Sequence, residues 1–132
     1  MRGKTIAYWI ATVFVAFIMT VSGGLALSHT PRFMTALAHL GYPVYFSNLL
    51  GVGKLVGVGV LLAPGLGRFK EWAYAAFGIV VLSACYSHLF SGDGVMALEP
   101  LVTGAALVIS YVLRPADRRM AMAVRSEVRL SV

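Results

Sequence analysis

A run of 23 residues, Thr5 to Leu27, carries no charged side chain and constrains the fold more than any other feature. As an α-helix it would be about 34 Å long, enough to cross a hydrocarbon core of about 30 Å. A cleaved signal peptide has a shorter apolar core of about 7–15 residues, so we expect this run to remain as a span. Three further apolar runs follow, at residues 44–63, 72–90 and 96–113.

The composition agrees with a lipid-facing surface. Charged residues make up 12% of the 132 residues, and a soluble domain carries about 25%. The surface of the folded chain therefore cannot face water throughout. We expect a single all-α domain, an integral membrane four-helix bundle with spans at about 5–27, 44–63, 72–90 and 96–113.

A short helix is predicted between the first two spans. Thr30 followed by Pro31 is a typical helix start, and Gly41 with Pro43 is a typical stop. The apolar residues of this segment are spaced to lie on one face. We expect a short amphipathic helix in the first outer loop, lying on the membrane surface.

Basic residues predict the orientation of the bundle. Nine Lys and Arg residues lie outside the spans on the side of the two termini, and one, Arg32, lies on the other side. Lys and Arg are enriched in cytoplasmic loops, so we expect an N-in/C-in topology. Residues 1–115 would form the membrane domain, and residues 116–132 a basic cytoplasmic tail. These basic residues sit at span ends and not along one helical face, so we expect no nucleic-acid partner.

Polar residues are distributed unevenly along the predicted spans. Every histidine, two of the five acids and the only lysine within a span fall in the outer half, and we expect the inner half of the bundle to hold nothing ionisable. Lys54 is the most informative of them, because a lysine near mid-bilayer costs about 3 kcal/mol unless it finds a partner. We expect its amine to face the bundle interior and to approach Glu99 or Asp93. A structural ion pair and snorkelling toward the surface are the alternatives.

These residues define a candidate site in the outer half. We expect a lipophilic ligand to be contacted by Lys54, His88, Asn48, Tyr45 and Cys85. His88, Glu99 and Asp93 are the candidates for acid–base chemistry.

Each of these patterns also has a structural explanation. Cys85 and His88 lie three apart, which fits a nucleophile with its base or a buried thiol beside an imidazole. Glu99 before Pro100 fits helix capping, and Asp93 between two glycines fits a turn. The spacing of the histidines and acids favours no metal site. The single cysteine excludes a CxxC pair.

Several short motifs along the chain match one known family: Gly23-Gly24, the segment Leu50–Gly57, Pro64 with the segment Arg68–Ala75, Ser87-His88, Gly92-Asp93 and Pro100. Through these residues the chain resembles the DoxX-like family of small bacterial four-span membrane proteins. The resemblance implies a multi-pass protein of the bacterial inner membrane. It also implies a role in oxidation systems, with relatives that include a thiosulfate–quinone oxidoreductase and partners of redox enzymes. The architecture is similar to that of the sterol-isomerase and sigma-2-receptor superfamily, which binds lipophilic ligands.

Three functions fit this sequence, and they leave open whether the protein is an enzyme. The first is binding of a small lipophilic molecule, a quinone or isoprenoid, in an outer-half cavity as the membrane component of a redox system. The chain has no nucleotide, flavin or haem motif, so electrons would come from the ligand or a soluble redox partner. The second is a membrane isomerase or cyclase that moves protons on a lipophilic substrate. The third is a non-catalytic scaffold that recruits a soluble redox enzyme through its arginine tail. The expected partners are the lipid bilayer, a lipophilic small molecule, and a soluble redox protein or further copies of the chain in a homo-oligomer.

Overall fold

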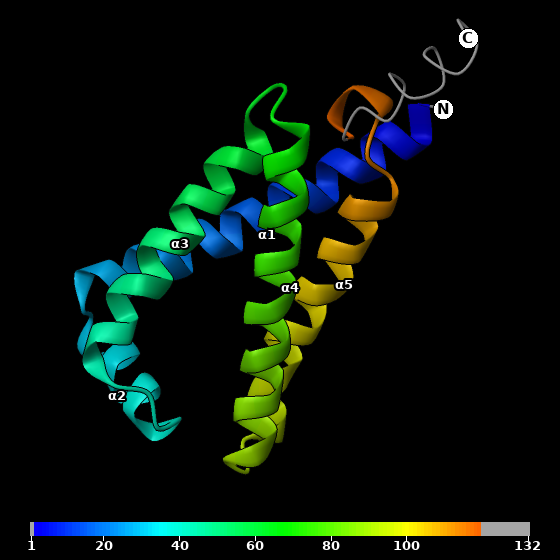
Figure 1. The fold of residues 1–132 in the computed structure, drawn as a ribbon. Helices are drawn as coiled ribbons and strands as arrows, with labels where there is room; N and C mark the ends of the chain where they lie inside the picture. The colour runs from blue at the N-terminus through cyan, green and yellow to red at the C-terminus, as the bar shows by residue number, and fades with distance from the viewer. Residues whose placement is uncertain (1, 120–132) are drawn as a thin grey trace, which may run out of the picture.

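A computed structural model describes residues 2–119 of the protein, and within them every regular element is helical. Figure 1 shows how these helices are arranged. In chain order the elements are α1 (Arg2–Ser28), α2 (Pro31–His39), α3 (Val44–Leu62), α4 (Gly67–Phe90), η1 (Gly94–Ala97), α5 (Leu98–Val112) and η2 (Ala116–Arg118).

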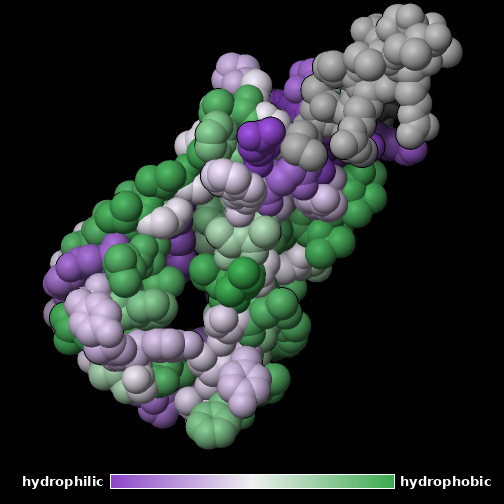
Figure 2. Space-filling model, in the orientation of Figure 1, coloured by the Kyte–Doolittle hydropathy of each residue, from purple (hydrophilic) through white to green (hydrophobic). Residues whose placement is uncertain are grey.

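Within residues 2–119, four segments are long and apolar enough to cross a membrane: α1, α3, α4 and the continuous stretch Gly94–Val112. Large apolar side chains point outward along these helices, with Leu82 71% and Ile10 67% exposed. In Figure 2 hydrophobic residues cover much of the helices, and hydrophilic ones gather near the end where the described chain finishes. The predicted all-α, multi-pass membrane architecture is confirmed.

The helix boundaries follow the turn residues. Pro31 occupies the first turn of α2, and Gly41, just beyond its end, has a φ of +86° that a side chain would oppose. The short loop helix was therefore correctly predicted from the sequence. Helix α4, which contains the predicted third span 72–90, begins five residues before that span, at Gly67. The charged residues 68, 70 and 71 end the apolar run without ending the helix.

The four long helices form a ring in the order α1, α3, α4, α5. α1 packs against α3 and α5, α4 packs against the same two helices, and α1 and α4 occupy opposite corners. The start of α1, the α3–α4 turn and the end of α5 lie at one end of the molecule, here called the termini end (Figure 1). The other end, here called the α2 end, holds α2 and the α4–η1 turn.

Glycines bring α3 close to both of its neighbours. A Cβ at Gly51 would lie 2.5 Å from Leu27 Cγ of α1, and a Cβ at Gly57 would lie 2.5 Å from Phe77 Cζ of α4. Phe77 is 2% exposed and belongs to the main hydrophobic core. Close approach through small residues is the usual packing mode of membrane helices, and it fixes α3 against α4 in the half nearer the termini.

Candidate functional site

A cavity of about 420 Å³ lies between α3 and α4 at the α2 end, with α2 across it. Its volume is in the range of small-molecule sites. Figure 2 shows the hollow on this face of the molecule. All five α-helices and the α2–α3 turn contribute to its walls, which are mostly apolar. The lining residues are Ser22, Phe33, Ala36, Leu37, Leu40, Tyr42, Phe46, Leu50, Lys54, Ile79, Val80, Ser83, Ala84, His88 and Glu99.

Lys54 reaches this cavity from the middle of α3. Its Nζ donates a hydrogen bond to Ser22 Oγ of α1 at 2.5 Å. The bond is possible because Gly23 has no side chain, so α1 runs close to Lys54; a Cβ on Gly23 would lie 3.2 Å from Lys54 Cβ. An ammonium has three N–H donors. Among the described residues only Ser22 accepts one of them, and two donors remain for the cavity.

Glu99 supplies the negative charge that faces Lys54. It lies in the first turn of α5, where Thr103 Oγ1 donates to its Oε1 at 3.0 Å. Glu99 and Lys54 line the same cavity and interact electrostatically. Within residues 2–119 the two groups do not form a direct ion pair. The carboxylate therefore offsets the positive charge of Lys54 but accepts none of its hydrogen bonds.

His88 lines the cavity on the α4 side, and Asp93 lies behind it. Asp93 Oδ2 is 2.7 Å from His39 Nε2 and 3.9 Å from His88 Nδ1. The nearer contact is a hydrogen bond between the end of α2 and the turn after α4. His88 Nδ1 is buried and has no hydrogen-bond partner in the described part of the chain. Since Nδ1 faces Asp93, Nε2 is the nitrogen available to the cavity. Because Nδ1 has no hydrogen bond, neither tautomer of the His88 ring is fixed.

Four of the predicted site residues lie outside the cavity lining. Asp93 bonds to His39 rather than to Lys54. Tyr45 is 68% exposed, Asn48 Oδ1 is 2.7 Å from His29 Nε2, and Cys85 is buried in the hydrophobic core. The structure thus brings together three of the predicted residues, Lys54, His88 and Glu99, and their role as ligand contacts stays a prediction. Residues 2–119 contain no group of three His, Cys, Asp or Glu side chains placed to hold a metal ion.

The sequence-based interpretation missed three polar residues that line the cavity: Ser22, Tyr42 and Ser83. Single hydroxyls within apolar runs are common in spans and give no local signal. Ser22 stands directly before Gly23-Gly24, and only the close approach that Gly23 permits makes it a partner of Lys54.

Helix α2 forms the cover of the cavity. Its apolar face places Phe33, Ala36 and Leu37 in the lining, and Leu40, directly after the helix, joins them. Two bonds hold it and the following turn across to α4: His39 with Asp93, and Tyr42 OH with Ser87 Oγ at 2.7 Å. These contacts explain why three residues outside the lining, His39, Ser87 and Asp93, still matter to its shape.

The comparisons with known proteins bear on this arrangement. The model of the DoxX-like family matches residues 10–110, a stretch that contains every residue of the cavity lining. The chain belongs to the DoxX-like family. No curated protein and no solved structure matches it.

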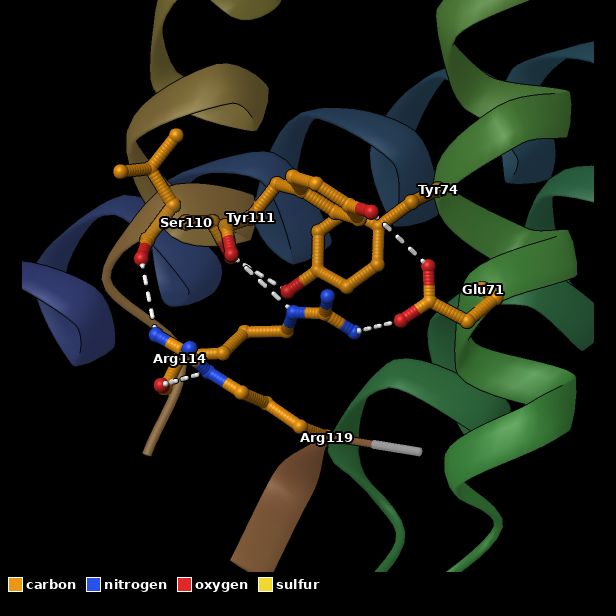
Figure 3. Close-up of polar contacts among 7 residues, drawn as sticks. Glu71, Tyr74, Ser110, Tyr111, Arg114 and Arg119 are labelled. Carbon is orange, nitrogen blue, oxygen red and sulfur yellow. Dashed lines mark hydrogen bonds and ion pairs between the residues drawn. The ribbon is translucent and has the colours of Figure 1, made fainter. Parts of the chain in front are cut away.

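A second polar cluster of this DoxX-like protein lies at the termini end (Figure 3). Arg114 is 6% exposed, and its guanidinium lies 2.6 Å from Glu71 Oε1 and stacks over the rings of Tyr74 and Tyr111. Tyr111 OH donates to Glu71 Oε2 at 3.1 Å. The cluster joins the N-terminal part of α4 to the end of α5.

Other basic residues at this end cap the helices. Lys70 is fully buried, and its Nζ donates to the Val60 and Ala63 carbonyls at the end of α3. Arg118 donates to the Leu61 carbonyl at 3.1 Å. These donors satisfy carbonyls that have no partner within the last turn of a helix. The expectation that the inner half holds nothing ionisable is thus wrong for the termini end, where charges counted only as orientation signals are packed into the bundle.

Proposed function

We propose that this DoxX-like protein binds a small lipophilic molecule with a neutral, carbonyl-bearing head, of the quinone class, in the cavity between α3 and α4. The observation that carries the proposal is the Lys54 ammonium, which faces a mostly apolar cavity with two donors that residues 2–119 leave without an acceptor. A donor in such surroundings gains most from a ligand that accepts a hydrogen bond.

The charges around the cavity favour a neutral head over an anionic one. Glu99 opposes the Lys54 charge in the same cavity, so an added carboxylate or phosphate would meet repulsion from Glu99. A quinone offers two carbonyl acceptors and no charge. Lys54 Nζ and His88 Nε2 would bond these carbonyls from two sides, and the apolar walls from α2, α3 and α4 would surround the ring.

A redox role follows from the chemistry of such a ligand. Cys85, the only thiol, is buried in the core and lines none of the cavity. Electrons would therefore be carried by the quinone and exchanged with a partner protein, and this chain would hold and position the ring. We propose that the protein acts in this way as the membrane component of a redox system.

Ligand binding has more support than acid–base catalysis. A general base is usually oriented by a hydrogen bond from a third group. His88 Nδ1 and Asp93 Oδ2 are 3.9 Å apart, and Asp93 is engaged by His39. In the described chain His88 therefore lacks the partner that a catalytic histidine needs.

We expect Lys54→Met to weaken binding of a short-chain benzoquinone by about 10- to 100-fold, because a hydrogen bond from a charged donor contributes about 1.5–3 kcal/mol. The measurement is a titration monitored by thermal unfolding in nanodiscs, together with mass spectrometry of the lipids that co-purify. Arg32→Met is the matched control, because it removes an exposed cation of α2 that does not line the cavity. Equal affinities for all three proteins would contradict the proposal.

We further propose that the termini end faces the cytoplasm. Seven of the described Lys and Arg residues lie at that end, and Arg32 lies near the other. The prediction is that a cysteine introduced at Gly3 in a Cys85→Ser background is shielded from a membrane-impermeant maleimide in intact cells, and that one at Gly94 reacts. The reverse labelling pattern would contradict the orientation.

A further inference from the structure

A second hollow, of about 270 Å³, runs along α3 and α4 and continues from the cavity. Four residues line both spaces: Phe46, Leu50, Lys54 and Val80. We call the second hollow the α3–α4 groove. Its other lining residues are Leu49, Gly53, Gly57, Ala73, Ala76 and Phe77.

The groove is apolar apart from Lys54. All of its other lining residues are aliphatic, aromatic or glycine. Gly53 makes the hollow possible, since it is exposed and a Cβ there would meet no heavy atom within 4 Å. The groove reaches Gly57, where α3 touches the Phe77 ring. It therefore starts at the polar centre of the site and runs to the contact between the two helices.

We propose that the α3–α4 groove holds the hydrocarbon chain of the ligand, so that the ligand is a chain-bearing amphiphile that enters sideways from the bilayer. This inference rests on the proposed function, because the head of the same molecule would occupy the cavity at Lys54. A compact ligand such as a steroid would fill the cavity and leave the groove empty.

The depth of Lys54 distinguishes this occupant from an ordinary bilayer lipid. Lys54 lies in the middle of α3, a spanning helix of 19 residues. A phospholipid cannot bring its charged headgroup to mid-bilayer without a large desolvation cost. A neutral quinone-type head reaches that depth readily, and its prenyl or alkyl chain then lies over Gly53.

The test compares two glycines of α3 that differ only in their place on the helix. Gly53 and Gly59 are both exposed, and a Cβ at either would meet no heavy atom within 4 Å. Gly53 lines the groove and Gly59 lines neither hollow. Gly53→Leu should therefore fill the groove without disturbing the helix packing, and Gly59→Leu is the matched control.

The probes are three benzoquinones with the same head and no chain, a decyl chain or a long prenyl chain. Affinity is measured in nanodiscs and expressed per mole fraction in the bilayer, so that membrane partitioning affects all variants equally. For wild type and Gly59→Leu we expect the chain to raise affinity about tenfold through packing contacts. For Gly53→Leu the chain should no longer raise the affinity, and the affinity for the benzoquinone without a chain should be unchanged.

Other outcomes would overturn the groove inference alone or the proposed function with it. If chain-free quinone binds in a Lys54-dependent way and the chain adds nothing, the proposed function stands and the groove inference is overturned. The inference also fails if the hydrocarbon chain raises the affinity of Gly53→Leu as much as that of wild type. It fails as well if wild type is an oligomer that Gly53→Leu breaks up, because the groove would then be a contact between copies of the protein. If wild type binds none of the three probes, the inference and the proposed function both fail.

Discussion

Replacing Glu71 with Gln is expected to destabilise the protein by about 3 kcal/mol, the largest effect we anticipate for a conservative change. The substitution keeps the shape of the side chain but removes the charge that Arg114 contacts at 2.6 Å. Arg114 has only 5% of its side chain exposed, so it would be left as a buried cation without a counter-charge. The value is set at the low end of the range for buried pairs, because Glu71 itself is 28% exposed.

The stability is measured by unfolding in detergent micelles, with Asp117→Asn as the control for loss of an acid at the same end. Asp117 is exposed in η2, and its replacement should change the free energy of unfolding by less than about 0.5 kcal/mol. The double variant Glu71→Gln/Arg114→Met should recover most of the loss, since a buried pair can often be replaced by apolar groups. If Glu71→Gln has the same free energy of unfolding as wild type, the cluster does not hold α4 to α5.

Gly57→Ala is expected to cost about 1–3 kcal/mol of stability through overpacking. The new methyl group would lie 2.5 Å from Phe77 Cζ and 2.7 Å from Phe77 Cε1. Phe77 is 2% exposed within the core and also lines the α3–α4 groove, so its ring can relieve the contact only by shifting into that hollow. Either α3 and α4 must separate or the ring must leave its rotamer, and both lower the stability of the bundle.

Gly59→Ala, two residues along the same helix, is the control for this prediction. A Cβ there meets nothing within 4 Å, so alanine should be neutral or slightly stabilising through its higher helix propensity. Combining Gly57→Ala with Phe77→Leu should restore part of the loss, and a double-mutant cycle measures that coupling. Equal unfolding temperatures for Gly57→Ala and Gly59→Ala would show that the ring accommodates the methyl group.

The sequence predicts those features that depend on local patterns. The four spans follow from apolar runs, and α2 follows from Thr30-Pro31 and Gly41. The inward position of Lys54 follows from the cost of placing a cation in hydrocarbon. These features do not depend on which helices touch, so the sequence alone is enough to predict them.

Features that depend on distant pairing could not be predicted. Asp93 was expected near Lys54 and instead bonds to His39, 54 residues away. Arg114 was counted as an orientation signal, but it is buried against Glu71, 43 residues earlier. In a membrane protein a charge at the end of an apolar run can anchor the chain in the headgroup region or close a helix contact. Composition and spacing look the same in both cases.

Side-chain contacts join the helices at the termini end, whereas a cavity lies between α3 and α4 at the α2 end. This asymmetry restricts how the protein can work. At the termini end, side chains from α4 and the segment after α5 bridge to neighbouring helices through Arg114, Lys70 and Arg118. At the α2 end, α3 and α4 stand apart around the cavity. Under the proposed function, a ligand in that cavity would enter and leave on the α2 side without breaking the contacts at the termini end. That arrangement would favour holding the ligand for a neighbouring protein over carrying it across the membrane.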